Sequence, residues 1–262
     1  MDLLRKIRAS FLGLALLSAP AAAAELQATA DYLVHLGGTN IASVSVRLSD
    51  TGSHYAMALD ARIAGLAQFV ASGTARIGSA GRSTGSGLVS EKFDLRTRAE
   101  GEDFTVAIEY ASNDVTAFVI EPPLISPVDR VAVERKHLRD VNDMVASFVL
   151  KGGALDAGLC DRKLRIFTGI ERFNVAMRYL RSEEATSKRT GYQGPVVLCS
   201  IGYSPVSGHS ASSEITSYLA EDGQILIWYA PLQNPGYFIP YRVLVTTSVG
   251  DLSMVLTKLT QG

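Results

Sequence analysis

Hydrophobic and polar residues alternate with a period of two along much of the chain. The clearest series cover residues 44–48, 55–59, 104–110 and 173–179. Each series predicts a β-strand with one side facing a core. Short turns rich in Gly and Asp separate the series, which favours antiparallel neighbours because parallel crossovers need longer connections. These turns lie at Gly37-Gly38, 50–52, Gly169, 221–223 and 250–251.

One segment, Asp140–Gly153, breaks this alternation. Its apolar residues fall at positions 141, 144, 145, 148 and 149, the spacing of one face of an amphipathic helix. Asp140 can cap the start of this helix, Lys151 suits its last turn, and Gly152-Gly153 can end it. The pattern therefore predicts a mostly β fold, a long antiparallel sheet with one central α-helix whose apolar face packs on the sheet.

Two further segments lack a clear pattern. Residues 121–127 contain three prolines, which cannot donate hydrogen bonds to a strand ladder, so we expect an extended linker there. Residues 181–194 are polar and charged, and we expect a long exposed loop or hairpin tip.

The first 24 residues have the three parts of a secretory signal peptide. Arg5, Lys6 and Arg8 form a basic region, residues 11–17 are apolar, and Ala21–Ala24 offer a cleavage site. An N-terminal membrane anchor would need about 20 uninterrupted apolar residues. We therefore expect residues 1–24 to be removed and residues 25–262 to form a single β-rich domain in the periplasm, not an integral membrane protein.

Composition excludes several classes of protein. Hydrophobic residues make up 47% and charged residues 19% of the 262 positions, which excludes a disordered chain. The formal net charge is −1, so the basic surface of a general nucleic-acid-binding protein is not expected.

The chain has two cysteines, Cys160 and Cys199. An even number of cysteines in an exported chain favours a structural disulfide over a catalytic thiol or two buried free thiols. A loop of about 40 residues closed in this way gains roughly 4 kcal/mol in the chain-entropy description, less any strain.

The order of landmarks along the chain resembles a known family. The landmarks are Tyr32–Gly38, Gly65-Leu66, Gly87-Leu88, the Asp140 segment, Cys160, Tyr192–Cys199, Trp228–Pro231 and Tyr237–Arg242. Together they resemble a Gram-negative family of exported proteins catalogued as domain of unknown function 3108. The resemblance implies a periplasmic protein without an established reaction. It also suggests a curved antiparallel sheet, a half-barrel or β-spiral wrapped on the helix, as in lipoprotein carriers, although fold analogy does not transfer a function.

Candidate catalytic residues are few, and each has a simpler explanation. Ser83 lies in a G-x-S-x-G sequence, but a nucleophile elbow needs a helix directly after it, and a strand-like run follows instead. His209 lies among small polar residues that are typical of a surface loop. Carboxylates that could support hydrolysis of a wall polymer sit in turns or on polar strand faces. These are Asp103, Glu109, Glu183 and Glu184.

No residue is therefore assigned a catalytic role, and no cofactor is expected. His35, His54 and His137 are isolated from one another and lack metal-ligand spacing, so no metal site is expected either.

Aromatic residues gather near the C-terminus around two proline-bearing turns, with one arginine beside them. Aromatic rings and a cation can line a groove for a glycan, lipid or peptide. The alternative is that alternate members belong to the sheet core. The candidate groove residues are Trp228, Tyr229, Tyr237, Tyr241 and Arg242.

These observations favour a non-catalytic envelope protein that binds a hydrophobic or glycan ligand or a partner protein. Two alternatives stay open. One is a cell-wall polymer hydrolase, and the other is a structural protein whose sheet edge accepts a partner strand.

Overall fold

The structure is a computed structural model that describes residues 25–262, apart from residues 66–67, 69–71, 125–128, 234–235 and 248–249. The predicted signal peptide, residues 1–24, lies outside the described residues. No helix in the described part of the chain is long and apolar enough to cross a membrane.

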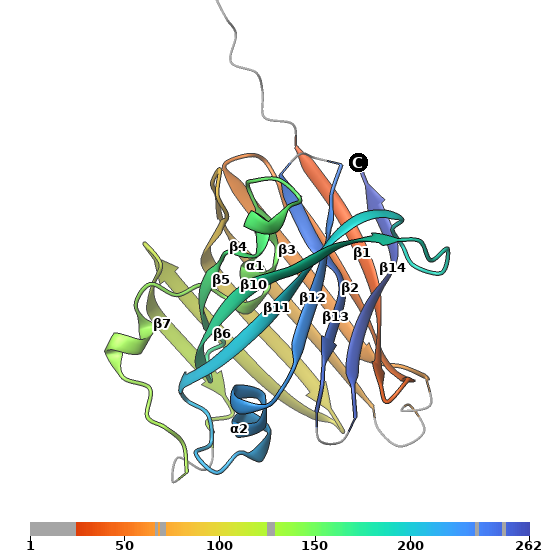
Figure 1. The fold of residues 1–262 in the computed structure, drawn as a ribbon. Coiled ribbons are helices and arrows are strands. Elements are labelled where there is room, and N and C mark those ends of the chain that lie inside the picture. Colours follow the sequence, from red (N-terminus) through yellow and green to blue (C-terminus); the bar gives the residue numbers. More distant parts are fainter. Residues whose placement is uncertain (1–24, 66–67, 69–71, 125–128, 234–235, 248–249) are drawn as a thin grey trace, which may run out of the picture.

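The first half of the chain is a meander of consecutive antiparallel strands (Figure 1). The strand predictions at residues 44–48, 55–59 and 104–110 are confirmed, in β2, β3 and β6. The strands are β1 (Leu26–Leu36), β2 (Thr39–Asp50), β3 (His54–Ile63), β4 (Gly73–Ser83), β5 (Leu88–Ala99), β6 (Glu102–Ala111) and β7 (Asp114–Glu121).

The second half contains the helices and the remaining strands. Its helical elements are the 3-10 turns η2 (Arg135–Leu138) and η3 (Ala157–Cys160) and the α-helices α1 (Met144–Phe148) and α2 (Glu214–Glu221). Its strands are β8 (Leu150–Lys151), β9 (Lys163–Phe167), β10 (Arg172–Ala185), β11 (Gly194–Ser207), β12 (Ile225–Pro231), β13 (Tyr237–Val245) and β14 (Leu252–Gln261).

One antiparallel sheet connects the two halves, because the last strand β14 pairs with the first strand β1. The order is β7-β6-β5-β4-β3-β2-β1-β14-β13-β12-β11-β10-β9, and β8 pairs with β13. Figure 1 shows the sheet curling so that the second-half strands lie across the first-half strands. The described strands do not close into a full barrel, so the fold is mostly β and barrel-like.

Residue Asn142 links the end strand β9 to β5, which are not paired in the described sheet. Its backbone exchanges hydrogen bonds with β9, from Asn142 N to Arg165 O at 2.9 Å and from Phe167 N to Asn142 O at 3.1 Å. Its side chain bonds β5, accepting from Ser90 N at 2.7 Å and donating to Leu88 O at 2.8 Å. The segment after β7 thus joins β9 to β5, where strand pairing is missing.

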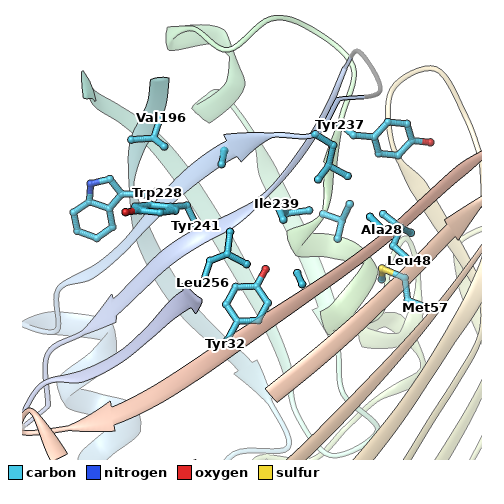
Figure 2. Close-up of a cluster of buried hydrophobic side chains, with 14 of the residues drawn as sticks. Ala28, Tyr32, Leu48, Met57, Val196, Trp228, Tyr237, Ile239, Tyr241 and Leu256 are labelled. Atoms are coloured by element: carbon cyan, nitrogen blue, oxygen red, sulfur yellow. The ribbon is translucent and has the colours of Figure 1, made fainter. Parts of the chain in front are cut away.

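Three clusters of buried side chains form the core. The largest joins β1–β3 and β14 to β11–β13 and α1, and Figure 2 shows its members Ala28, Leu48 and Met57 with Ile239 of β13. A second cluster covers the other face of β10–β13 with Leu150 and residues of η3. The third joins β5, β6 and β9.

The predicted helix over Asp140–Gly153 is much shorter than expected. Only Met144–Phe148 are helical, and Asp143, not Asp140, is the N-cap. Leu150-Lys151 instead pairs with Tyr237-Phe238 of β13. Tertiary pairing therefore outweighs the local helical pattern at the C-terminal end of this segment.

A second helix, α2, was not predicted, and it directly follows the small polar residues around His209 that predicted a surface loop. The Ser213 side chain caps α2 by accepting a hydrogen bond from Thr216 N at 3.2 Å. Residues 181–194 are a hairpin tip, as expected, but β10 runs to Ala185 and β11 begins at Gly194. Of the predicted proline linker, residues Pro122–Leu124 are described and belong to no strand or helix, and residues 125–127 lie outside the described residues.

Candidate functional site

An apolar cavity of about 230 Å³ lies between α1 and the inner face of the sheet. All fifteen lining residues are hydrophobic or tyrosine. They are Ala28, Ala30, Tyr32, Val44, Val46, Leu48, Leu59, Ile77, Met144, Val145, Phe148, Val149, Ile239, Pro240 and Met254.

The cavity follows from the alternating pattern of β1 and β2. The inward positions of β1 include two alanines, Ala28 and Ala30, and those of β2 include Val44 and Val46. Small residues at inward positions leave space that larger side chains would fill. Met144 of α1 is 37% exposed, and Val44, Val46, Leu59 and Ile77 are half-buried. These half-buried side chains mark where the cavity approaches solvent.

Asp143 fixes the start of α1 from inside the protein. Its side chain is fully buried and accepts hydrogen bonds from Val145 N and Ala146 N, both at 2.8 Å. Ser79 Oγ of β4 donates at 2.6 Å, and Ser90 Oγ of β5 donates as well. One carboxylate therefore connects the helix cap to two strands of the sheet.

Burial raises the pKa of the Asp143 carboxyl, and the hydrogen bonds from the serines and amides offset only part of that rise. The Tyr55 hydroxyl lies 3.0 Å from Ser79 Oγ and donates to Ser90 Oγ at 3.3 Å. Burial, with the nearby charge of Asp143, raises the pKa of Tyr55, so this hydroxyl remains protonated. We call Asp143, Ser79, Ser90 and Tyr55 the Asp143 cluster.

A second buried carboxylate, Asp50, holds the other end of the α1 segment. Asp50 is 1% exposed at the end of β2, and Ser83 and Tyr237 donate hydroxyl hydrogen bonds to it. Lys151 Nζ lies 3.3 Å from Asp50 Oδ2 and 4.7 Å from the centre of the Tyr237 ring. We call these four residues the Asp50 cluster.

Burial alone would raise the pKa of Asp50, but other interactions outweigh it and hold the pKa below its usual value. They are the hydrogen bonds from Ser83, Tyr237 and Gly52 N and the charge of Lys151. The Asp50 cluster is therefore a neutral, hydrogen-bonded ion pair beyond the Leu48 end of the cavity.

Ser83, the candidate nucleophile of the G-x-S-x-G sequence, lies at the end of β4 within the Asp50 cluster. Residues 84–87 form a turn that leads into β5, so a strand follows Ser83, as the sequence suggested. Its hydroxyl donates to Asp50, while Lys151 donates to Ser83 Oγ. Both of these contacts of the Ser83 hydroxyl therefore lie within the Asp50 cluster.

The predicted aromatic groove does not form as one open surface. Trp228, Tyr229, Tyr237 and Tyr241 are all buried in the core, which is the alternative that the sequence left open. Trp228 Nε1 donates to Glu183 Oε2 at 2.9 Å, and the exposed Arg242 lies over the Trp228 ring at 5.2 Å. Trp228, Tyr237 and Tyr241 pack in the largest cluster and Tyr229 packs in the second, on the other face of the sheet, so the rings do not line one groove.

The other candidate residues lie apart from the cavity. His209 precedes α2, and its carbonyl accepts a hydrogen bond from Val131 N at 3.0 Å. Glu183 pairs with Arg181, and Asp103 lies 4.0 Å from Arg98, while Glu109 and Glu184 are exposed. Among the described residues, no group of three or more His, Cys, Asp or Glu side chains could hold a metal ion.

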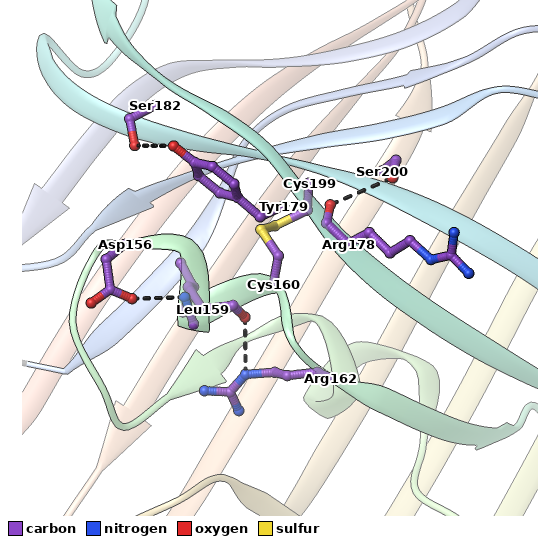
Figure 3. The surroundings of a disulfide bond; sticks show 10 residues. Asp156, Leu159, Cys160, Arg162, Arg178, Tyr179, Ser182, Cys199 and Ser200 are labelled. Atoms are coloured by element: carbon purple, nitrogen blue, oxygen red, sulfur yellow. Dashed lines mark hydrogen bonds between the residues drawn. A yellow bond between two sulfur atoms is a disulfide. The ribbon is translucent and has the colours of Figure 1, made fainter.

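The predicted pairing of Cys160 with Cys199 is present. The two Cα atoms are 5.6 Å apart, and the bond ties η3 to β11 (Figure 3). Arg162 Nε donates to Leu159 O at 3.2 Å, and Arg162 Nη2 donates to Lys151 O at 3.1 Å. The disulfide therefore anchors the chain just after the segment that walls the cavity.

Sequence reasoning missed both carboxylate clusters. Asp50 continues the inward series of Val44, Val46 and Leu48, so its place in the apolar register of β2 was a usable signal. Ser79 and Ser83 likewise fall on the inward positions of β4. A polar residue in an inward position of a strand is a candidate for a buried hydrogen-bond network.

The structure is similar to that of a β-barrel-like protein of the domain of unknown function DUF1849 from Brucella abortus. The TM-score is 0.55 with 10% sequence identity, over 92% of this chain and 99% of that one. Similarity at this low identity concerns the fold alone. No curated protein sequence is significantly similar to this chain.

The family resemblance noted in the sequence is confirmed. Residues 31–257, which include every strand from β2 to β13, match the family described as "Protein of unknown function (DUF3108)". The match extends through nearly the whole of the curled sheet and both carboxylate clusters. The chain therefore belongs to the DUF3108 family of proteins of unknown function.

Proposed function

We propose that this protein is a non-catalytic periplasmic factor of the cell envelope that binds a hydrophobic ligand in the cavity beneath α1. The observation that carries the proposal is the lining, since a cavity walled by fifteen hydrophobic or tyrosine residues suits an apolar chain. Ligand sites are mostly apolar concavities with few polar groups. The volume of about 230 Å³ is small for such a site and suits one chain or part of one.

The polar clusters support binding over catalysis. Both carboxylates are fully engaged by hydrogen-bond donors, so neither is available to a substrate. A glycan would need exposed hydrogen-bonding groups in the site, and the cavity lining offers very few. A hydrophobic ligand is therefore favoured over a glycan. Export to the periplasm follows from the signal peptide and stays a prediction.

Binding can be tested with an uncharged probe, the methyl ester of a dansyl-labelled fatty acid, and a pair of matched variants. Val46→Phe adds volume to the cavity wall, and we expect it to weaken binding by at least about tenfold, which is 1.4 kcal/mol. Val89→Phe makes the same change at a half-buried strand position outside the cavity, and we expect it to bind as wild type does. Equal affinity in all three proteins would overturn the proposal.

The native ligand can be sought by native mass spectrometry of protein purified from its own periplasm. A co-purifying lipid that is lost in Val46→Phe supports the proposal. Recovery of the mature protein from the membrane fraction with Met1 intact would contradict the predicted export.

A second candidate function is strand addition by a partner protein at β7. Within the described sheet, β7 pairs only with β6, and its centre carries Phe118 and Val119, which is 55% exposed. Charges occur only at the ends of the strand, so its edge is poorly protected against pairing. A photo-cross-linking residue at Val119 that captures no protein in cells would exclude this function.

A further inference from the structure

Tyr32 is the one described residue lining the cavity whose side chain carries a polar group. Tyr32 lies on β1 opposite Leu256 of β14, and its side chain is 4% exposed. Figure 2 shows the ring among the core side chains, near Leu256. Tyr32 lines the cavity together with fourteen residues that are purely hydrophobic.

The Tyr32 hydroxyl has no hydrogen-bond partner within the described part of the chain. Burial raises the pKa of Tyr32, and no hydrogen bond or charge contributes to that rise. The hydroxyl is therefore protonated and free to donate. Buried tyrosine hydroxyls usually find a partner, because leaving a buried donor unsatisfied costs about 1–3 kcal/mol.

The other buried tyrosines show what is unusual about Tyr32. Tyr55, Tyr110 and Tyr237 each bond a group of the protein through their hydroxyls. Tyr229 is fully buried, and its hydroxyl also has no partner among the described residues, but Tyr229 does not line the cavity. In this set, Tyr32 alone both lines the cavity and carries a hydroxyl that bonds no described residue.

We infer that Tyr32 selects a ligand that carries an uncharged hydrogen-bond acceptor, such as the carbonyl of an acyl ester or amide, next to its apolar chain. This inference deepens the proposed function and rests on it. The carbonyl accepts from the Tyr32 hydroxyl while the chain fills the apolar space. A carboxylate is disfavoured because no described lining residue carries a positive charge to accompany it into the cavity.

The test compares two probes of equal length, an n-alkane and the corresponding fatty acid methyl ester, by isothermal titration. We expect wild-type protein to bind the ester about tenfold more tightly, the upper end of a typical net hydrogen bond. Tyr32→Phe should reduce this preference to about twofold or less while it retains alkane binding. Tyr229→Phe removes a buried, unpartnered hydroxyl outside the cavity and should keep the tenfold preference.

Each outcome separates the inference from the proposed function. If neither probe binds wild-type protein, the proposed function fails. If both probes bind equally, or if Tyr32→Phe keeps the preference, the hydrophobic site stands and the role of Tyr32 is wrong. An ordered water held by Tyr32 in a ligand-bound crystal structure would also overturn the inference.

Discussion

The segment that contains α1 and η3, residues 140–162, is attached to the sheet in two different ways. Around α1, two buried carboxylates hold it to the first half of the sheet, Asp143 at the start and Asp50 through Lys151 at the end. Around η3, the disulfide to β11 and a hydrogen bond from Met177 N of β10 to Arg162 O hold it to the second half. The part that walls the cavity is thus tied by titratable groups, and the part beyond it is tied covalently.

The two attachments should respond differently to pH and to mutation. A disulfide is indifferent to pH, whereas a buried carboxylate responds to protonation and to the loss of any one partner. We expect perturbation of the carboxylate clusters to change both stability and the cavity, and loss of the disulfide to change stability alone. Four predictions test this contrast, in order of decreasing effect.

The largest effect is expected for Asp143→Ala. The substitution leaves two serine hydroxyls and two helix amides without their acceptor, so the free energy of unfolding should fall by about 3 kcal/mol. Urea denaturation measures the loss. Asp143→Asn retains an oxygen that can cap α1 and should recover at least about 1 kcal/mol. Equal losses in the two variants would show that the cap is not what holds the helix.

Loss of the disulfide should have a smaller effect. The double variant Cys160→Ala/Cys199→Ala should lower the free energy of unfolding by about 2 kcal/mol, the lower end for native disulfides. Its affinity for the dansyl-labelled methyl ester should equal that of wild type. Weaker binding in this variant would mean that the two attachments are not independent.

The contributions of Asp50 and Asp143 to the free energy of unfolding should change with pH in opposite directions. The pKa of Asp50 is lowered in the folded state, so its contribution is present above the ordinary carboxyl value near 3.9 and is lost as the pH falls through the folded value. The pKa of Asp143 is raised, so its contribution is complete below that ordinary value and is lost as the pH rises through the folded value.

Urea denaturation from acid to neutral pH distinguishes the two. In Asp50→Asn, the free energy of unfolding should fall less on acidification than in wild type. In Asp143→Asn, it should fall less as the pH rises toward neutral. The same change of slope in both variants would contradict the assignment of opposite shifts.

The smallest effect is expected for Asp140→Asn. Asp140 pairs with Arg165 at 2.8 Å, but both side chains are more than half exposed, so the pair should contribute less than about 0.5 kcal/mol. A loss comparable to that of Asp143→Ala would show that the segment is held at Asp140 after all.

Local patterns predicted the elements that depend on local properties. Alternation located β2, β3, β6 and β10, because an inward-facing strand side must be apolar wherever the strand lies in the sheet. The count of cysteines indicated the pair that is joined. The helical spacing after Asp140 predicted too long a helix, because a local pattern holds no information on distant strand partners. Leu150-Lys151 pairs with β13 instead.

The site was less accessible to sequence reasoning. Asp50 looked like a turn residue, and Tyr32 stood out only as the first residue of a family landmark. The aromatic residues near the C-terminus looked like a groove, yet the fold turned four of them into the core. In each case the outcome depended on partners distant in the sequence, such as Tyr237 for Asp50, 187 residues away.

The sequence by itself determined the strand pattern, the cysteine pairing and the family, because these follow from periodicity, residue counts and the order of motifs. Only the tertiary structure decided that inward alanines of β1 leave a cavity, that α1 closes over it, and that Tyr32 faces it without a partner. The physical reason is that alternation fixes which side of a strand is buried. What the buried side contacts depends on how the sheet curls and on which distant segment crosses its interior.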